Sequence, residues 1–494
     1  MKSIVSSELS AKITKRGQRV YVSNANISSR SKLKVGDLLQ ITYAAGGRMI
    51  KAKKTDVKGK DTISVTPSGK GVAVDLHNQS VKKALGSAVK KVTVMFMLGA
   101  LIIKPSMALE RAYKRILRAK CNLEQEKALT IGEVCHGVGG LGLALHSGFN
   151  KQGVGLRMAF ANDIDEDALA ASIANNPVWE DETIALNCSI EEIPLDILTQ
   201  VDVLAAGLSC KGASLQARTG ANKKLTAPEF HSEAGWLVAP FYHLIASEQI
   251  DPLVVLVENV CPYLDSASAE ILRNSLDRLG YDYHELIIKA YEDFGCLENR
   301  NRAVMVFVTK GLDLDLSSIV DFHSTSSRLQ VGDVIDKSNL FVNEDKKGWY
   351  SKDRLIEREE KARQEGRGHR AVISNPSDSK VSTLTASYGR GVRLDESCVL
   401  SNCGKWLRLF NKYEHNQIKE FPVNLVNGVA ESVAHRLLGN SIQFKPFEAL
   451  GQILAKQLKS ALSTFGGVIN EITLNPIVPC KNPSLSRESQ LSLI

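Results

Sequence analysis

Two hydrophobic patterns divide the chain into an N-terminal part built of short strands and a longer part in which apolar strands alternate with helices. Within residues 12–54, apolar and polar positions alternate around Val20 and Val22 and again over 39–43, and glycines interrupt the alternation. A period of two that is broken by glycine is typical of strands joined by hairpins. The continuous apolar runs 201–206 and 253–257 are instead typical of strands buried on both faces. The pattern predicts a small β-rich domain followed by an α/β body.

The N-terminal pattern occurs a second time, in a looser form, over residues 72–105. The two segments correspond at an offset of 52 or 53 residues, which aligns Val20 with Val72, Ile41 with Val94, Gly46 with Gly99, and Ile50-Lys51 with Ile103-Lys104. A fixed offset is the mark of an internal repeat, although two unrelated hairpins would leave a similar trace. Both interpretations stay open at this stage.

Residues 106–128 predict a helix that links the two parts. Ser106 is placed as its N-cap, because a serine hydroxyl accepts a hydrogen bond from the first turn. One side carries Arg111, Lys114, Arg115 and Arg118. We interpret this basic side as a solvated linker face, with contact to phosphate as the alternative.

Charge is distributed very unevenly along the 494 residues. Residues 1–120 hold 25 Lys and Arg against 6 Asp and Glu, a balance of +19, whereas the remainder holds 37 against 48, a balance of −11. Lysine and arginine supply most sequence-independent affinity for phosphate chains, so the first part is expected to meet a polyanion such as nucleic acid. A hydrophobic content of 44% excludes wholesale disorder.

The cysteines and the absence of long apolar runs bear on compartment and metal content. The nine cysteines are scattered, without a CxxC pair or a His/Cys cluster at ligand spacing. This favours a reduced cytoplasmic compartment and no metal site. No window of 18 uninterrupted apolar residues occurs, and residues 1–3 lead into polar sequence, so we expect neither a membrane span nor a signal peptide.

A glycine-rich loop opens the body. An apolar strand after residue 128 leads into Gly137-Val-Gly139-Gly140-Leu-Gly142 and then a helix, a pattern that suits a phosphate or nucleotide at a helix N-terminus. The next strand ends at Asp163, where a carboxylate accepts hydrogen bonds from ribose hydroxyls. NAD and S-adenosylmethionine both carry that ribose, and a helix-capping role for Asp163 is the plainer alternative.

Reactive side chains follow the buried strands further along. Cys210 comes after the strand 201–206, and Glu258 and Asn259 end the strand 253–257. Because the carboxyl ends of parallel strands meet at one edge of a sheet, these residues are expected to meet at the cofactor crevice. Arg300 and Arg302 follow between two apolar segments. A sulfur nucleophile, a carboxylate and arginines suit attack on an electron-poor ring, whereas NAD chemistry does not account for them.

These motifs together resemble the DNA (cytosine-5) methyltransferases. The glycine loop is similar to that family's F-x-G-x-G motif. The segment GLSCKGAS around Cys210 is similar to its G-x-P-C-Q-x-x-S motif, and the segment ENRNR (298–302) is similar to its Q-x-R-x-R motif. ENV at Glu258 is identical to the family triplet, and LGNSI (438–442) is similar to the late G-N-x-V motif. The resemblance covers roughly residues 130–310 and 380–460. The order of five motifs is specific, whereas any single motif is weak.

The resemblance implies a role for each of these residues. Cys210 would add to carbon 6 of a flipped-out cytosine, Glu258 would protonate ring nitrogen 3, and Arg302 would hold the carbonyl oxygen. Arg300 would support Arg302, and Asn259 would orient the loop of Cys210, with residues 212–220 closing over the target. The methyl donor would be S-adenosylmethionine. Its expected contacts are Gly137, Gly139, Gly140, Asp163, Ile164, Asn440 and Ser441.

Several positions depart from the family pattern. Cys135 stands at a phenylalanine position, and Ser209, Lys211 and Ala213 surround the nucleophile with unusual residues. Ser189 stands where an acidic residue is expected, and Glu298 replaces the glutamine of Q-x-R-x-R. The alternative functions are therefore a DNA-binding transcription regulator with a weakened methyltransferase body, or a tRNA cytosine-5 methyltransferase.

The N-terminal part resembles the AbrB-type swapped-hairpin DNA-binding modules. The resemblance rests on Thr14, Gly17, Gln18, Leu33, Gly36 and Asp37. Such modules normally need two chains, so it implies duplex DNA as partner and either self-association through the arm or, if the repeat is real, closure within one chain.

The predicted fold class is therefore α/β: a Rossmann-like S-adenosylmethionine-dependent methyltransferase with a mostly parallel sheet and a small β-rich N-terminal domain. Inserted into it is a target-recognition region, in which 353–365 predicts a charged helix and 366–370 a DNA-contacting loop. The expected domains are an arm (1–105), a helical linker (106–128), the catalytic domain (129–310), the recognition region (311–405), a return to the catalytic domain (406–465) and a tail (466–494).

Overall fold

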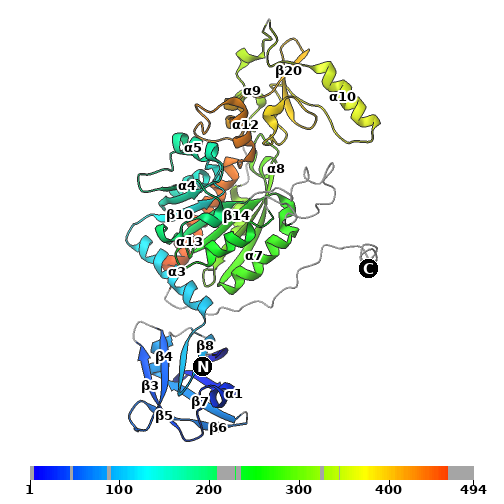
Figure 1. The fold of residues 1–494 in the computed structure, drawn as a ribbon. Helices are drawn as coiled ribbons and strands as arrows, with labels where there is room; N and C mark the ends of the chain where they lie inside the picture. The colour runs from blue at the N-terminus through cyan, green and yellow to red at the C-terminus, as the bar shows by residue number, and fades with distance from the viewer. Residues whose placement is uncertain are drawn as a thin grey trace, which may run out of the picture.

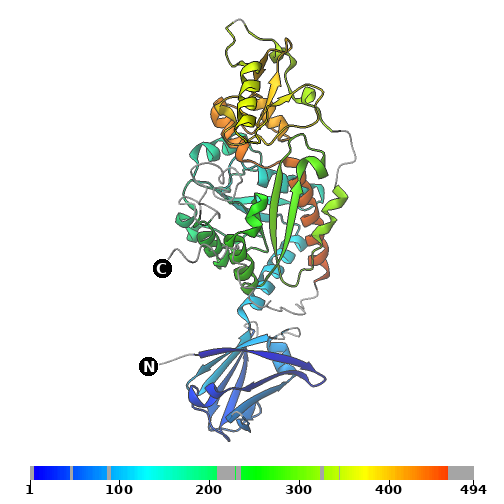
Figure 2. The same ribbon diagram turned by 90° about the vertical axis from the view of Figure 1, so that its right-hand side faces the viewer.

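The computed structural model describes residues 5–44, 48–69, 71–85, 89, 91–208, 229, 235–322, 328–343 and 345–465. Figures 1 and 2 show three parts in a row. The N-terminal arm lies at one end, the α/β body in the middle, and the recognition region at the opposite end.

The arm is a small β domain. In chain order its elements are β1 (Val5–Thr14), β2 (Gly17–Ser23), α1 (Ala25–Ser29), β3 (Leu38–Ala44), β4 (Met49–Thr55), β5 (Thr62–Ser64), β6 (Thr66–Ser68), β7 (Gly71–Asn78), α2 (Gln79–Leu85), β8 (Lys91–Met97) and β9 (Ala100–Pro105). Hydrogen bonds join the strands in the order β5-β3-β4-β9-β8-β1-β2-β7-β6. Alternate side chains, such as Val92, Val94 and Phe96 on β8, are buried, as the period-two pattern predicts.

The two repeats seen in the sequence have the same order of elements. The first runs β2-α1-β3-β4 and the second runs β7-α2-β8-β9. They join twice, where β2 pairs with β7 and β4 pairs with β9. Val22 lies directly opposite Val74 in the first pairing, and Ile50 lies directly opposite Ile103 in the second. Pairing of equivalent residues is what a local two-fold axis requires, so the copies form a pseudo-symmetric pair within one chain.

The body is built around a seven-stranded sheet. Its strands are β10 (Leu129–Val134), β11 (Leu156–Asn162), β12 (Ile184–Leu186), β13 (Val203–Gly207), β14 (Val254–Asn259), β15 (Tyr281–Lys289) and β16 (Asn301–Thr309), in the order β12-β11-β10-β13-β14-β16-β15. All pairings from β12 to β14 are parallel, whereas β16 is antiparallel to both of its neighbours.

Helices cover both faces of this sheet. Val203 and Leu256 belong to the apolar cluster that includes α4 (Gly140–Lys151) and α13 (Phe444–Thr464). Leu204 and Val257 belong to the cluster that includes α6 (Val238–Ala246) and α7 (Ala267–Arg278). Adjacent residues of one strand therefore pack into two separate hydrophobic cores. For this reason nearly every position of these strands is apolar. Shorter elements of the body are α5 (Glu166–Asn175), η1 (Ile190–Glu192), η2 (Leu195–Ile197), η5 (Cys261–Asp265) and α8 (Ala290–Phe294).

The recognition region holds a second, four-stranded sheet. Its elements are η6 (Leu316–Phe322), α9 (Val331–Val334), η7 (Lys337–Leu340), β17 (Tyr350–Ser351), α10 (Lys352–Gln364), β18 (Val372–Ser374), η8 (Tyr388–Arg390), β19 (Ser397–Leu400) and β20 (Trp406–Arg408). The strand order is β17-β20-β19-β18. Because β20 belongs to this sheet, the region extends past the expected boundary at 405. The chain then returns to the body through α11 (Lys412–Ile418) and α12 (Glu431–Asn440).

The linking helix α3 (Met107–Glu124) begins as predicted, with the Ser106 hydroxyl accepting a hydrogen bond from Leu109 N. The interpretation of its basic side was wrong for three of the four residues. Arg111 and Arg115 are buried and both reach one carboxylate oxygen of Asp251, at 2.5 and 2.7 Å. Helix spacing alone could not distinguish this face from a solvated one, because Asp251 is far away in the sequence.

Further contacts along α3 hold it against the body. Arg118 donates to Val201 O at 2.7 Å and lies 3.3 Å from the Asp202 carboxylate. Lys114 follows the expectation, because it is exposed and pairs only with Glu110 one turn away. The helix therefore serves as a docked connector between arm and body.

The part of the chain that the structure describes contains seven cysteines, all of them free. No helix in this part is long and apolar enough to cross a membrane. Within the same residues, no group of three or more His, Cys, Asp or Glu side chains could hold a metal ion.

We predict that Asp251→Asn destabilises the body strongly. Removing the carboxylate leaves two buried guanidinium groups without their counter-charge, which costs about 3–5 kcal/mol. Lys114→Gln, on the exposed side of the same helix, is the matched control and should change stability by less than about 0.5 kcal/mol. Urea unfolding followed by circular dichroism measures both variants. Equal unfolding midpoints would show that α3 does not depend on Asp251.

Candidate active site

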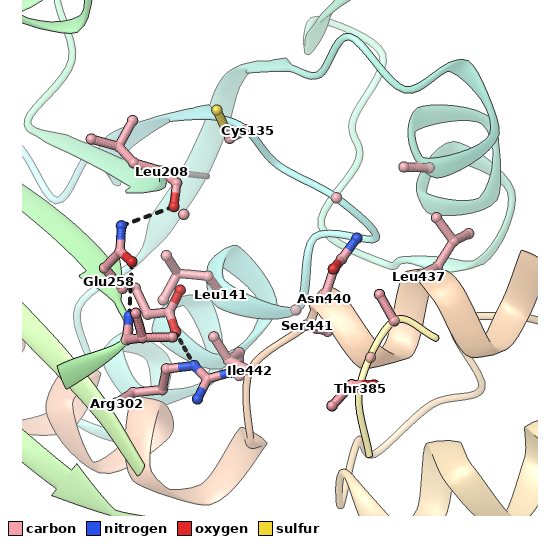
Figure 3. Close-up of a pocket in the computed structure, with 18 of the residues that line it drawn as sticks. Cys135, Leu141, Leu208, Glu258, Arg302, Thr385, Leu437, Asn440, Ser441 and Ile442 are labelled. Carbon is pink, nitrogen blue, oxygen red and sulfur yellow. Dashed lines mark hydrogen bonds and ion pairs between the residues drawn. The ribbon is translucent and has the colours of Figure 1, made fainter. Parts of the chain in front are cut away.

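A cavity of about 1440 Å³ opens at the carboxyl edge of the parallel strands. Its walls come from the ends of β10, β11, β13 and β14, from the start of β16, from the recognition region and from the end of α12. In Figure 3, Glu258 and Arg302 lie on one side of this cavity, and Asn440 and Ser441 lie on the other. Of the predicted site residues that the structure describes, only Gly139 is not part of the wall.

The glycine loop turns sharply between β10 and α4. Gly137 and Gly139 have φ angles of +60° and +73°, in the left-handed region that favours glycine. Gly137 and Gly140 line the cavity, whereas Gly139 faces into the protein. A Cβ on Gly139 would come within 2.6 Å of the His136 ring and 2.4 Å of the Asn176 amide. Gly139 therefore serves the packing of the loop, and its expected contact with a cofactor stays a prediction.

Asp163 lies at the end of β11 and holds the same loop. One carboxylate oxygen accepts from Gly137 N at 2.6 Å and the other accepts from Asp165 N at 2.8 Å. Burial raises the pKa of this carboxyl, although both hydrogen bonds act in the opposite direction. The neighbouring Ile164 side chain is 74% exposed and lines the cavity. The Asp163 carboxylate can accept a hydrogen bond from a polar group, and the adjacent Ile164 side chain can pack against a flat ring.

Sequence reasoning missed a polar group beneath the loop. His136 contacts the Glu133 carboxylate through Nδ1, and its Nε2 lies 2.8 Å from the Ser172 hydroxyl. Trp179 Nε1 donates to the same hydroxyl at 3.0 Å. The available signal was Glu133, a charged residue inside an otherwise apolar strand. Its burial with a partner fixes the ring that packs under Gly139.

The predicted nucleophile Cys210 lies outside the described residues, as do Ser209, Lys211, Ala213 and the segment 212–220. Leu208, the last described residue before this segment, lines the cavity. Asn259 Nδ2 donates to Leu208 O at 3.0 Å. This bond ties the end of β14 to the chain two residues before Cys210. The expected role of Asn259 in orienting the loop of Cys210 stays a prediction.

Glu258 and Arg302 form the charged centre of the site. Arg302 Nε lies 2.9 Å from Glu258 Oε1, and both side chains are largely buried (Figure 3). The pair follows from the sheet, because β14 and β16 are antiparallel neighbours with Glu258 opposite Val304. The two side chains form an acid and a cation side by side on the cavity wall, which suits a ring that gains negative charge.

Arg300 lines the same cavity and contacts the late motif. Its Nη2 donates to Gly439 O at 3.1 Å, and its Nη1 lies 3.8 Å from Glu298 Oε1. Both Arg300 and Glu298 are buried. Arg300 therefore joins the segment just before β16 to the end of α12.

Glu298, the residue that departs from the family glutamine, has a buried counter-charge. Lys419 Nζ lies 2.6 Å from Glu298 Oε2, and Leu384 N donates to Oε1 at 2.8 Å. Burial, with Arg300 nearby, lowers the pKa of Lys419 to about 7, and Glu298 acts against this shift. The carboxylate thus joins the body to the recognition region through Leu384 and to the segment that follows this region through Lys419. The sequence signal was weak, because Lys419 is 121 residues away.

Cys135 is the only cysteine of the glycine loop, and it lines the cavity. Desolvation, together with the charge of Asp163, raises the pKa of its thiol to about 12. The thiolate is the reactive form of cysteine, so Cys135 is inert as a nucleophile near neutral pH.

The late motif lies where one helix ends and another begins. Asn440 is the last residue of α12, Ser441 follows it as C-cap, and α13 starts at Phe444. The motif therefore lies at a helix end. A Cβ on Gly140 would lie 2.6 Å from Ser441 Oγ, so the two motifs pack directly against each other.

Comparison with known proteins agrees with this geometry. The family model described as C-5 cytosine-specific DNA methylase matches residues 129–456. The Type II methyltransferase M1.ScrFI of Lactococcus lactis subsp. cremoris is 25% identical over 336 residues, which cover 66% of this chain and 77% of the relative. The Type II methyltransferase M1.BsuMI of Bacillus subtilis (strain 168) is 29% identical over 221 residues, covering 41% of this chain and 48% of the relative.

A solved structure shares the fold of the body. The S. pombe Dnmt2 methyltransferase superposes with a TM-score of 0.50 at 20% identity, covering 66% of this chain and 98% of that one. The arm lies outside the family match. From the glycine loop to the late motif, the chain belongs to the C-5 cytosine-specific DNA methylase family and is an S-adenosylmethionine-dependent DNA methyltransferase.

Proposed function

We propose that this methyltransferase acts through Cys210, Glu258 and Arg302 on a cytosine flipped out of duplex DNA. The observation that carries the assignment is the Glu258–Arg302 pair, which lies on the cavity wall at the edge to which the strand before Cys210 also leads. Chemistry on carbon 5 cannot occur inside the base stack, and the cavity has room for an extruded base.

Each residue has one task in this mechanism. Cys210 adds as thiolate to carbon 6 of the ring, and the displaced electron pair moves toward nitrogen 3. The Glu258 carboxyl group would donate a proton to that nitrogen, while Arg302 holds the carbonyl oxygen. Carbon 5, now electron-rich, would form its new bond to the methyl carbon as the bond between that carbon and the donor's sulfonium sulfur breaks. Removal of the carbon 5 proton by a base, return of the nitrogen 3 proton to Glu258 and expulsion of the Cys210 sulfur as thiolate would then restore the aromatic ring.

The described residues fit S-adenosylmethionine, which supplies the methyl group when bound. Gly137 presents backbone without a side chain, Asp163 lies beside it as an acceptor, and Ile164 offers an exposed apolar surface for a flat ring. Asn440 and Ser441 complete the opposite wall. The proposed role of Arg300 is to support Arg302 from the segment before β16, where its guanidinium donates to Gly439 O.

The recognition region contributes to the same cavity. Arg358 of α10, His369 of the predicted loop and Arg393 all lie on its wall. His369 Nδ1 lies 2.5 Å from the Asp395 carboxylate, which orients the ring. These side chains are the proposed contacts with DNA around the target base.

The arm is the proposed second DNA-binding element, as the AbrB-type resemblance implies. Its support is the basic balance of the first 120 residues and the repeated β-α-β-β order. The two copies pair with each other through β2 with β7 and β4 with β9, so the module needs no second chain for its sheet. A place in restriction and modification follows from the names of the relatives and is likewise proposed for this chain.

We predict that Cys210→Ser abolishes methyl transfer, because a hydroxyl is a far poorer nucleophile than a thiolate. Glu258→Gln should slow turnover by about 10²- to 10⁴-fold and Arg302→Gln by about 10²- to 10³-fold. Incorporation of label from S-adenosylmethionine into duplex DNA and into tRNA measures these rates.

Cys121→Ser, at an exposed cysteine of α3, is the matched control and should retain full turnover. Label in tRNA but not in DNA would support the alternative substrate. Label in neither polymer would favour the regulator with a weakened body. Turnover that persists in Cys210→Ser would remove this residue from the mechanism.

We also predict that Glu298→Gln destabilises the protein in a pH-dependent way. Lys419 has a pKa of about 7 when folded, against about 10.4 in an unfolded chain, so the unfolded chain binds more protons between these values. Stability therefore rises with pH through this window. At pH 6, where Lys419 is charged, loss of Glu298 should cost about 3 kcal/mol, and the cost should shrink at pH 9.

The double variant Glu298→Gln with Lys419→Met tests the same pair without a buried charge. It should regain most of the stability at pH 6, because replacing both partners of a buried pair is often nearly neutral. Urea unfolding at the two pH values measures the effect. A cost that is the same at pH 6 and pH 9 would contradict the prediction.

A further inference from the structure

The arm is attached to the body at the edge opposite the cavity. Helix α3 binds Asp202, which precedes β13, and Asp251, which precedes β14. The cavity lies where the same strands end, at Leu208 and Glu258. The parallel strands therefore separate the two places by their full length, about 20 Å for six residues. Figures 1 and 2 show the arm and the recognition region at opposite ends of the molecule.

The attachment leaves little freedom for the arm to swing. Only Ser106 lies between the last residue of β9 and the first residue of α3. The apolar core of the arm continues into the body through Leu109, Ala112 and Ile116 of α3. The guanidinium of Arg48, next to β4, lies 4.2 Å from the centre of the Tyr113 ring on α3. Strand, helix and body thus form one continuous packed unit.

The end of the arm turned away from the body carries a basic cluster. We define this distal cluster as seven exposed cations: Arg30, Lys32, Lys34, Lys53, Lys54, Lys58 and Lys60. Backbone hydrogen bonds bring their segments together, because Gly99 N donates to Ser31 O and Lys54 N donates to Gly99 O. Gly99 immediately precedes β9, at the end of this strand that is far from α3, so these segments share that end. The acidic residues there are Asp37, which pairs with Lys54, Asp56 and Asp61.

The equivalent end of the second repeat faces the body instead. After β4 the first repeat continues into the basic loop 56–60, whereas after β9 the second continues into α3. The segment after α1 carries Arg30 and Lys32, and at an offset of 53 the second repeat has Lys83 and Leu85. Leu85 is buried, and its carbonyl accepts from Arg48. Two ends related by pseudo-symmetry therefore differ: one is docked and the other is exposed and cationic.

We infer that the distal cluster binds a second duplex of DNA, separate from the duplex in the active site, so that one chain bridges two DNA segments. The inference rests on the proposed binding of DNA by the arm. The occupant is identified by charge complementarity, since a patch of seven cations suits a phosphate backbone. Helix α3 alone spans about 27 Å, and the arm extends beyond it.

The stiffness of duplex DNA limits which two segments one chain can bind at the same time. A duplex is stiff over about 150 bp, so a short duplex held in the cavity cannot bend back to the far end of the arm. The two sites are therefore filled by two molecules or by distant parts of one long molecule. In the second case the first contact raises the local concentration of the other segment.

The test uses the full chain and two 30-bp duplexes of mixed sequence, one fixed to beads and one fluorescent. Protein-dependent capture of the fluorescent duplex measures bridging, and methylation of the free duplex pool measures the active site. The variant Lys53→Glu, Lys58→Glu, Lys60→Glu should lower capture by about tenfold or more and keep the turnover of the wild type.

The control variant Lys12→Glu, Lys15→Glu, Lys83→Glu changes the net charge equally at exposed positions toward the other end of the arm. It should bridge like the wild type. Capture that is lost equally in both variants would mean that charge alone, and not the distal cluster, attracts DNA. Capture that survives in the distal variant would come from paired copies of the chain and would overturn the inference.

The two readouts separate this inference from the function on which it rests. Methylation without capture by the wild type would leave the enzyme standing and reject bridging. Capture without methylation would leave bridging standing and reject the assigned catalytic activity. A fluorescent RNA duplex captured in preference to DNA would overturn DNA as the occupant.

Discussion

The direction of the parallel strands is the constraint on which the molecule depends. From β12 to β14 every pairing is parallel, so all of these strands end at one edge and begin at the other. The ends bring together the glycine loop, Asp163 and Glu258, which no local sequence would place side by side. The beginnings carry Asp202 and Asp251, where α3 docks. The sheet thus places the cavity at one edge and the docking site of α3 at the opposite edge.

Buried ion pairs then fix the positions of the arm and the recognition region relative to the body. Asp251 pairs with two arginines of the linking helix α3, and Glu298 pairs with Lys419 next to the recognition region. Such pairs contribute little net stability, because desolvation offsets much of their attraction. They do penalise every arrangement that separates the partners. This explains how a charged residue replaces the family glutamine at 298 in a fully buried position, since its counter-charge is supplied from α11 and its neighbours.

Local patterns predicted most of what is local. Strand ends, the charged helix predicted at 353–365 and found at 352–364, and the start of α3 follow from residues close together in sequence. The repeat was found by comparing two such local patterns. The family motifs implied that Glu258 and Arg302 serve one site, whereas their direct contact was not predicted. What could not be predicted depends on distant partners: the burial of Arg111 and Arg115, the pairing of Glu298, and the inward direction of Gly139. An arginine on a helix looks the same whether it meets water or an aspartate 136 residues away.

The pseudo-symmetry of the arm has a consequence for the binding of DNA that is proposed for it. A symmetric pair of modules suits a palindrome, because each half reads the same sequence in opposite orientation. In this arm one of the two equivalent ends is covered by α3, so only one half is available. A DNA site for the arm would therefore have a direction. The methyltransferase body would then always lie on the same side of this DNA site.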